Sequence, residues 1–336
     1  MHMIRNQMIK RIPLDRIMAQ GSRYALSRRF EPFVEQVSSG LALNLDQAGL
    51  LMPVLAKLPP NNSQHLHLID GFKRYQWACR KGLSGIDVKI LAQDFPDLKI
   101  ATYLAHEHAG IISSTIAAKA LFITFCSGLG LENEDLIEII LPAIGLPAQR
   151  SLLDKYRRIG ALPQEVLSFC HEKSLSFKRC LNLTYHDRKL LAWLMGYRNA
   201  LHLTATIFQE LLDAFDEIMR RKEMSFHDLK DTQDISKILK DEALSASEKT
   251  ARLRGMLRLL RQPTLTAINA DLDKWRCQVE GGNQVLSIGW DRSLEYEHVE
   301  IRARITDMAQ LEAVMEHLQS DRSLSAINKM LERLKA

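Results

Sequence analysis

Apolar and polar positions alternate early in the chain in a way that predicts a small mixed sheet. Residues 53–56 (Pro-Val-Leu-Ala) are apolar and are followed by prolines and asparagines, which stop strands. Residues 65–69 and 86–91 alternate between apolar and polar side chains, as half-buried strands do. Between these two stretches, an Asp-Gly turn and helical spacing predict a helix over about residues 72–81.

Helical spacing of apolar residues dominates the middle of the chain. Helices are expected over residues 31–48, 98–107, 115–129, 132–141 and 187–224. In the fourth of these, the residues expected to face inward are Leu136, Ile139 and Ile140. A glycine-containing break follows at 142–146, and the next helix is expected from Pro147, at the first helical position, to Ile159. Helix, short turn and helix over about residues 132–160 form a helix-turn-helix pattern.

The last third of the chain changes character. Residues 247–262 predict a basic amphipathic helix that Pro263 ends. Residues 284–290 and 298–305 alternate like strands, and residues 308–318 predict a helix. Its apolar stripe consists of Leu311, Val314, Met315 and Leu318. Two strands and one helix make a poor core alone, so this unit is expected to dock onto another domain or another protomer.

Length and composition place these elements in an α+β protein. A chain of 336 residues is long enough for several domains, which we expect at 1–105, 106–246 and 247–336. No apolar run reaches membrane-spanning length, and five cysteines without a Cys-x-x-Cys pair indicate neither a disulfide framework nor a zinc site. A reducing cytoplasm is therefore the expected location, and no membrane partner is expected. The net charge is +5, but residues 1–93 hold 13 Lys and Arg against 6 Asp and Glu, which fits a polyanionic partner.

Gly71 opens the predicted helix at residues 72–81, and Lys73 and Arg74 follow it. Unpaired backbone N–H groups and positive charge at a helix N-terminus make a site for an anion such as phosphate. The alternative is a simple connector with two solvated basic residues, which on spacing alone is the favoured interpretation.

The second helix of the helix-turn-helix pattern carries a basic face. Its polar residues are Gln149, Arg150, Ser151, Lys155, Arg157 and Arg158. Gln and Arg read base edges in the major groove, while Lys and Arg hold phosphates. A helical hairpin with a solvated basic face is the alternative. A basic loop at residues 23–29 is a second candidate contact, through Arg23, Arg28 and Arg29.

Several stretches in the right order resemble the ParB family of partition proteins, whose N-terminal domain shares its fold with sulfiredoxin. Residues 8–17 resemble the family's entry strand, and Gly49 and Pro53 match its first box. Gly71, Lys73, Arg74 and Ala78 match its Gly-Glu-Arg-Arg-x-x-Ala box, with Phe72 in place of the glutamate. Residues 162–166 (Leu-Pro-Gln-Glu-Val) and 174–176 (Ser-Leu-Ser) resemble the family's DNA-binding helices.

The resemblance implies a cytoplasmic, nucleoid-associated protein that binds double-stranded DNA, forms a homodimer and works with a partition ATPase. Its role would be plasmid or chromosome partitioning, or regulation of genes near its site. It also implies binding of cytidine triphosphate (CTP) with Mg²⁺, in which the family uses a Glu-Asn-x-x-Arg box. Glu107 matches that box, but His108 replaces the asparagine and an isoleucine stands near the arginine position, so hydrolysis is expected to be weak or absent.

Two other function classes stay open at this point. A ParB-domain nucleotidase or nuclease would need a cluster of carboxylates to hold a metal ion. The sequence offers only Asp70 and Glu107 as candidate ligands. A non-catalytic scaffold with a relic helix-turn-helix would be expected to have lost the basic residues between Arg150 and Arg158. No catalytic residue and no metal ligand is assigned from the sequence.

Overall fold

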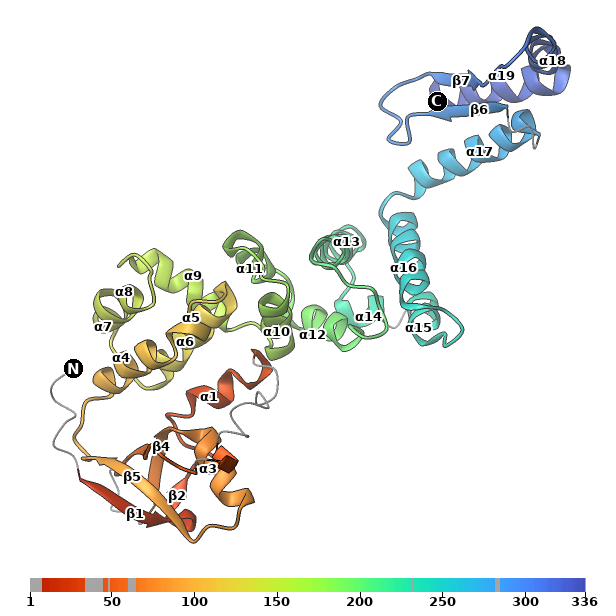
Figure 1. Cartoon of the computed structure of the whole chain (residues 1–336). Helices are drawn as coiled ribbons and strands as arrows, with labels where there is room; N and C mark the ends of the chain where they lie inside the picture. Colours follow the sequence, from red (N-terminus) through yellow and green to blue (C-terminus); the bar gives the residue numbers. More distant parts are fainter. Residues whose placement is uncertain are drawn as a thin grey trace. The chain divides into compact units, whose positions relative to one another are not determined.

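The computed structural model describes residues 8–33, 45–47, 49–59, 65–230, 233–281 and 285–335. It is a mixed α+β protein with a helical majority (Figure 1). The chain divides into two compact units, residues 1–198 with 204–209, and residues 199–203 with 210–336. The helix expected over residues 31–48 lies mostly outside the described residues, and the domain boundaries at 105 and 246 stay predictions.

The first unit begins with a five-stranded sheet in the order β1-β5-β3-β4-β2. Its strands are β1 (Ile9–Pro13), β2 (Ile17–Met18), β3 (Val54–Lys57), β4 (Leu66–Asp70) and β5 (Gly85–Leu91). The pairs β1–β5 and β3–β4 are antiparallel, whereas β3–β5 and β2–β4 are parallel. The inward residues of the central strands, among them Val54, Leu68 and Val88, are fully buried. The three strands expected at 53–56, 65–69 and 86–91 are therefore confirmed within two residues at each end.

Helix α3 (Phe72–Arg80) follows β4 through the Asp-Gly turn and packs on the sheet. Gly71 has a φ of 93°, and a Cβ atom there would lie 2.8 Å from Val54 Cγ1. Only glycine combines this left-handed backbone with so close a neighbour. The turn thus fixes where α3 starts relative to β3.

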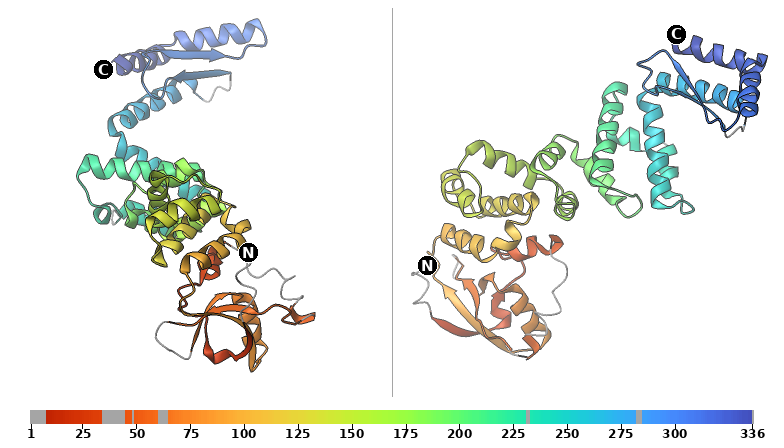
Figure 2. Two further views of the ribbon diagram at one scale, coloured as in Figure 1. Left: turned by 90° about the vertical axis from the view of Figure 1, so that its left-hand side faces the viewer. Right: turned by 45° about the horizontal axis from the view of Figure 1, so that its top comes forward.

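The helices of the first unit form one group beside the sheet (Figure 2). They are α1 (Leu26–Arg29), α4 (Asp97–Glu107), α5 (Ala109–Ile112), α6 (Ile116–Gly128), α7 (Asn133–Asp135), α8 (Leu141–Ala143), α9 (Arg150–Gly160), α10 (Gln164–Glu172), α11 (Phe177–Leu183) and α12 (Arg188–Gly196). Short 3-10 turns η1 (Leu14–Arg16) and η2 (Glu31–Phe33) lie between β1 and the first gap in the described residues. Helix α6 is buried on nearly all sides and forms the centre of the group.

The helix-turn-helix region differs from its expected boundaries. A π-helical turn, η3 (Leu136–Ile140), joins α7 to α8, so the first helix continues through Pro142 instead of breaking there. Helix α9 begins at Arg150, and Pro147 lies ahead of its N-cap, Gln149. The expectation of Pro147 at the first helical position was wrong, because the N–H of Gln149 bonds to the Pro147 carbonyl in a separate turn. Ile139, expected inside, is 40% exposed because the wider π turn rotates it outward.

The second unit contains α13 (Ala205–Lys222) from residue 210 onward, α14 (Phe226–Lys230), α15 (Gln233–Lys240), α16 (Ala246–Arg261), α17 (Pro263–Glu280), the hairpin β6 (Leu286–Trp290) and β7 (Val299–Ala303), α18 (Met308–Gln319) and α19 (Asp321–Lys335). The basic helix, both strands and the helix after them are confirmed. The small core predicted from two strands and one helix was incomplete, because α17 and α19 supply Leu272, Val279, Ala326 and Met330 to it. Pro263 both follows α16 and starts α17, where its missing N–H costs nothing.

Candidate nucleic-acid interface

Helix α9 is held in the first unit by one apolar face. Leu153, Tyr156 and Ile159 are buried, and the Tyr156 ring packs against Phe177 of α11 at 5.2 Å between ring centres. At its end, a Cβ atom on Gly160 would lie 2.0 Å from Thr124 Oγ1 and 2.8 Å from the Ala120 carbonyl oxygen. Only glycine therefore lets α9 approach α6 this closely.

The opposite face of α9 is exposed at the residues expected to meet base edges. Arg150, Ser151 and Lys155 are exposed. Within the described ranges, neither Arg150 nor Lys155 forms an ion pair or a hydrogen bond through its side chain. Gln149 is exposed as the N-cap residue, and its carbonyl accepts the N–H groups of Leu152 and Leu153. The start of α9 therefore presents cationic and polar side chains whose donors point to solvent.

The two arginines in the last turn of α9 are tethered instead. Arg157 is half-buried, and its Nε donates to Ser127 Oγ of α6 at 3.2 Å. Arg158 donates through Nη2 to Thr184 Oγ1 at 2.8 Å, and its guanidinium lies 4.4 Å from the centre of the Tyr185 ring. A guanidinium has five N–H donors, so Arg158, which is exposed, still has donors for a phosphate. The bond from Arg157 to Ser127 positions the end of α9 on α6.

Tyr185 was not singled out from the sequence, although it is 68% exposed and lies directly against Arg158. It follows α11, whose Lys178 and Arg179 are also exposed. An exposed aromatic residue among basic ones was the signal that could have identified it. The geometry adds Tyr185 to the surface around the end of α9.

The basic stretch at residues 23–29, predicted as a loop that contacts phosphate, is partly buried. Tyr24 and Leu26 are buried, and the second half of the stretch, Leu26–Arg29, forms helix α1. Arg23 pairs with Asp97 at 3.2 Å and also donates to the Leu129 carbonyl oxygen. The Arg29 guanidinium lies 5.7 Å from the centre of the Phe125 ring, and the side chain of Arg28 lies outside the described part of the chain. The apolar residues Tyr24 and Leu26 are thus buried, while Arg23 and Arg29 stay exposed on this stretch.

Asp97 is the anchor of that packing. Lys57 Nζ, buried on β3, donates to Asp97 Oδ1 at 2.7 Å, and the Tyr24 hydroxyl donates to the same oxygen at 2.7 Å. Burial raises the pKa of the Asp97 carboxyl, but the Lys57 and Tyr24 hydrogen bonds and the Arg23 charge outweigh burial and lower it. The cluster joins the sheet to the first turn of α4.

The Gly71 cluster, defined here as Asp70, Gly71, Arg74, Tyr103 and His108, contains two of the predicted anion-binding residues, Gly71 and Arg74. Arg74 Nη1 donates to the carbonyl oxygens of Met52 at 3.1 Å and Pro53 at 2.8 Å. Arg74 Nη2 donates to Asp70 Oδ2 at 3.1 Å. Arg74 thus joins the start of α3 to the segment before β3.

Asp70 lies at the centre of the cluster. Its Oδ1 is 3.5 Å from His108 Nε2. Burial raises the pKa of Asp70, but the His108 hydrogen bond and charge, the Gly71 N–H and the Arg74 charge together lower it. The Gly71 N–H and the Arg74 guanidinium therefore already face a carboxylate of the protein.

Tyr103 completes the cluster from α4. Burial, and then the charges of Asp70 and Glu107, raise the pKa of Tyr103 to about 12, while Arg74 lowers it. Lys73 is exposed on the first turn of α3. The structure thus brings Gly71 and Arg74 together and adds Asp70, Tyr103 and His108, whereas Glu107 is exposed on α4, where its charge acts on Tyr103 of the same helix.

This arrangement does not fit a preformed site for CTP with Mg²⁺. The Arg74 guanidinium and the Gly71 N–H both donate to protein oxygens, among them the carboxylate of Asp70, whose negative charge repels phosphate. Within the described residues, no group of three or more His, Cys, Asp or Glu side chains could hold a metal ion.

The chain matches no protein-family model. No curated protein matches it either. None of the described helices combines the length and the apolar character that crossing a membrane requires.

Two solved structures are similar to part of the chain. The C-terminally truncated chromosome-partitioning protein ParB from Caulobacter crescentus, complexed to the centromeric parS site, is 16% identical with a TM-score of 0.30. That match covers 61% of this chain and 98% of the other. The same protein complexed with CTP-gamma-S is 18% identical with a TM-score of 0.23, over 56% of this chain and 98% of the other. Both TM-scores are low. Binding of DNA and of the nucleotide is therefore stated only for those two structures and not for this chain.

Proposed function

We propose that this chain binds double-stranded DNA through α9, as a ParB-like protein in plasmid or chromosome partitioning or in local gene regulation. The observation that carries the proposal is the contrast between the two faces of α9. One face is fixed in the first unit through Gly160 against α6 and three buried side chains, and the other exposes Arg150 and Lys155 with no described partner. A rigid helix with free cationic side chains on its outer face is what the major groove accepts.

The residues of α9 divide by role. Arg150 and Ser151 lie in the first turn, which usually meets base edges, and Gln149 stands just before them. Lys155 and Arg158 lie later on the exposed face, where contacts to the DNA backbone are expected. Arg157 holds the helix to Ser127. Sequence choice should therefore depend on the first turn, and salt-dependent affinity on the later cations.

The test begins with selection of bound fragments from random genomic DNA to obtain a specific site. Salt titrations of Arg150→Ala and Arg158→Ala on specific and scrambled duplexes then separate the roles. Arg150→Ala should cost about 1–3 kcal/mol on the specific site and little on scrambled DNA. Arg158→Ala should weaken both alike and reduce the salt slope by about one.

Arg80→Ala is the matched control, because Arg80 is exposed at the end of α3, outside α9. If neither α9 substitution differs from this control, α9 is not the reading helix. The stretch with Arg23, Arg28 and Arg29 would then be the next candidate.

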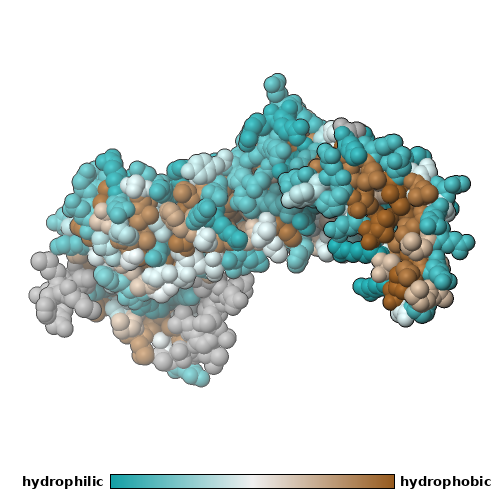
Figure 3. Space-filling model, turned by 90° about the horizontal axis from the view of Figure 1, so that it is seen from above, coloured by the Kyte–Doolittle hydropathy of each residue, from teal (hydrophilic) through white to brown (hydrophobic). Residues whose placement is uncertain are grey.

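Homodimer formation stays a proposal, and its best-placed surface is in the second unit. Figure 3 shows a hydrophobic area on this unit, whose exposed apolar side chains include Ile301, Ile305, Met308, Met315 and Leu324. Ile301 pairs with the buried Ile288 across the hairpin, so it lies on the apolar face of the sheet yet is 43% exposed. From the expected stripe on α18, Val314 and Leu318 pack inside, and Met315 is half exposed.

Light scattering tests the dimer. Ile301→Asp should lower the mass of the full chain from dimer to monomer, because a charge replaces apolar surface at the proposed contact. Ser287→Asp, on the polar face of the same hairpin, is the control and should leave the mass unchanged. Equal masses for all three proteins would refute this surface as the dimer contact.

Nucleotide binding by Gly71, Lys73, Arg74 and Glu107, and a partition ATPase as partner, also stay predictions. Because Arg74 already donates to three protein oxygens and His108 replaces the asparagine of the family's box, we expect phosphate release from CTP to be weak or absent, with or without DNA. Multiple turnovers that DNA stimulates and Arg74→Ala abolishes would overturn this expectation.

A further inference from the structure

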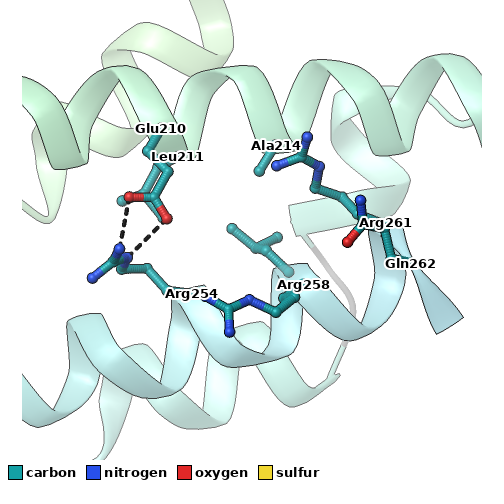
Figure 4. A pocket seen from close by; sticks show the side chains of 8 residues that line it. Glu210, Leu211, Ala214, Arg254, Arg258, Arg261 and Gln262 are labelled. Atoms are coloured by element: carbon teal, nitrogen blue, oxygen red, sulfur yellow. Dashed lines mark hydrogen bonds and ion pairs between the residues drawn. The ribbon is translucent and has the colours of Figure 1, made fainter. Parts of the chain in front are cut away.

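In the second unit, α13 and α16 are joined by ion pairs that repeat along the two helices. Figure 4 shows the pair between Glu210 and Arg254. Arg254 donates to Glu210 at 2.9 Å through Nε and at 2.8 Å through Nη2. Arg261 Nε donates to Glu217 at 2.7 Å. Each pair joins residues 44 positions apart, so the two helices run parallel to each other.

A third arginine stands between these pairs and lacks a carboxylate. At the same spacing Arg258 corresponds to Ala214, and both line one pocket. Arg258 is exposed and, within the described residues, has no ion pair or hydrogen bond through its side chain. Both oxygens of Glu210 are directed at Arg254, and in the described part of the chain Glu210 forms no ion pair or hydrogen bond with Arg258. The series of ion pairs therefore has one open position, with three arginines and two glutamates.

The open position is a cavity of about 140 Å³. Leu211, Ala214 and Leu257 are buried beneath it, and Arg254, Arg258 and Arg261 surround it (Figure 4). This volume is roughly ten times the minimum that one water molecule needs. The opening therefore admits a group of several oxygen atoms beside the unpaired Arg258.

The chemistry of arginine decides which group fits. A guanidinium presents five N–H donors in a planar fork that matches phosphate oxygens, and Arg254 uses only some of its donors on Glu210. A tetrahedral oxyanion with more than one negative charge satisfies an unpaired arginine and its two neighbours better than a neutral group does. We propose that the open position at Arg258 binds one phosphate group. Its source is either the backbone of DNA, which rests on the proposed function, or a free phosphorylated ligand, which does not.

The experiment uses the full chain and three variants. Arg258→Gln removes the unpaired cation, and Ala214→Glu supplies the missing carboxylate from α13. Arg252→Gln is the control, because Arg252 is exposed on α16 outside the pocket. One arm measures binding of inorganic phosphate by calorimetry at constant ionic strength, with chloride as reference. The other measures the salt dependence of binding to a scrambled duplex.

Both substitutions at the open position should weaken phosphate binding at least tenfold, whereas Arg252→Gln should leave it unchanged. A reduction of the salt slope by about one in Arg258→Gln identifies DNA as the source. Lost phosphate binding with unchanged DNA binding identifies a free ligand. If Ala214→Glu fails to fold because Ala214 is buried, Arg258→Gln decides alone.

The proposal is overturned if Arg258→Gln matches Arg252→Gln in both arms. It can fail separately from the proposed function, since Arg150→Ala should change site-specific DNA binding and leave phosphate binding intact. If the chain binds no DNA at all, the phosphate arm still decides whether Arg258 holds a phosphate group.

Discussion

Helix α9 and the Gly71 cluster look alike in the sequence, since both place basic residues near a glycine turn and both predict contact with phosphate. In the structure they differ in what their arginines already bind. Arg150 has no described partner, whereas Arg74 is bonded to two carbonyl oxygens and a carboxylate. Basic composition therefore indicates where an anion site can form, and the contacts decide whether its donors are available.

The largest expected effect concerns how α9 is held. Gly160→Ala puts a Cβ atom 2.0 Å from Thr124 Oγ1 and 2.8 Å from a backbone oxygen of α6, so the two helices must move apart. Overpacking of this kind should cost about 3 kcal/mol of unfolding free energy, measured by urea denaturation. DNA binding should fall with it.

Gly196→Ala is the matched control, because a Cβ atom at this helical glycine meets nothing within 4 Å. Its free energy of unfolding should change little. Equal stability of the two variants would contradict the close approach of α9 to α6 at Gly160.

The second-largest expected effect tests the difference between Arg74 and Arg150 through the free energy of unfolding. Arg74→Ala removes the donor from two carbonyl oxygens and leaves the largely buried Asp70 with one cationic neighbour fewer, so it should destabilise the fold by about 2 kcal/mol. Arg150→Ala removes no described contact and should stay within about 0.5 kcal/mol of the parent.

Lys73→Ala serves as the control beside Arg74, since Lys73 is exposed on the same helical turn. The midpoints of urea denaturation rank the three variants by stability, and Arg74→Ala should have the lowest midpoint. If Arg150→Ala lowers the free energy of unfolding as much as Arg74→Ala does, the proposed difference between a free and a bonded arginine is wrong.

The sequence predicted elements better than contacts. Strands β3, β4 and β5 and helices α3, α4 and α6 follow from local periodicity, so they were found close to their true bounds. Helix α19 was missed although Ser323, Ala326 and Met330 recur at helical spacing on its buried face.

The partners of the arginines could not be found in this way. Arg74 reaches carbonyl groups 21 and 22 residues back, Arg158 reaches a hydroxyl 26 residues ahead, and Arg23 reaches Asp97. Only the folded chain brings these segments together. The burial of Tyr24 and Leu26 within the basic stretch 23–29 could not be predicted either, because it depends on contacts with distant segments.

The smallest expected effect lies at the joint between the N-terminal segment and the helices. The imidazole of His171 stacks on Phe33 at 4.4 Å, its Nε2 donates to the Phe33 carbonyl oxygen at 3.0 Å, and the Thr115 hydroxyl at the start of α6 lies 2.8 Å from its Nδ1. This arrangement uses the neutral ring, with Nε2 as donor and Nδ1 as acceptor. Burial lowers the pKa of His171, and its hydrogen bond to Phe33 raises it by less, so the net direction is downward.

The sign of the pH dependence follows from that direction. Below the ordinary histidine value of about 6.5 the unfolded chain takes up this proton first, so stability should fall as the pH drops from about 6.5 toward the lower folded pKa. His171→Phe keeps the ring but cannot titrate, and it loses both hydrogen bonds. Its deficit against the parent in urea denaturation should therefore be largest near pH 7.5 and should shrink by pH 5.5. Other histidines, including His67 with its lowered pKa, titrate in both proteins and cancel in this difference. A deficit that stays constant over that range would show that His171 takes up its proton equally in the folded and unfolded chains, and that the joint beside α6 is insensitive to acid.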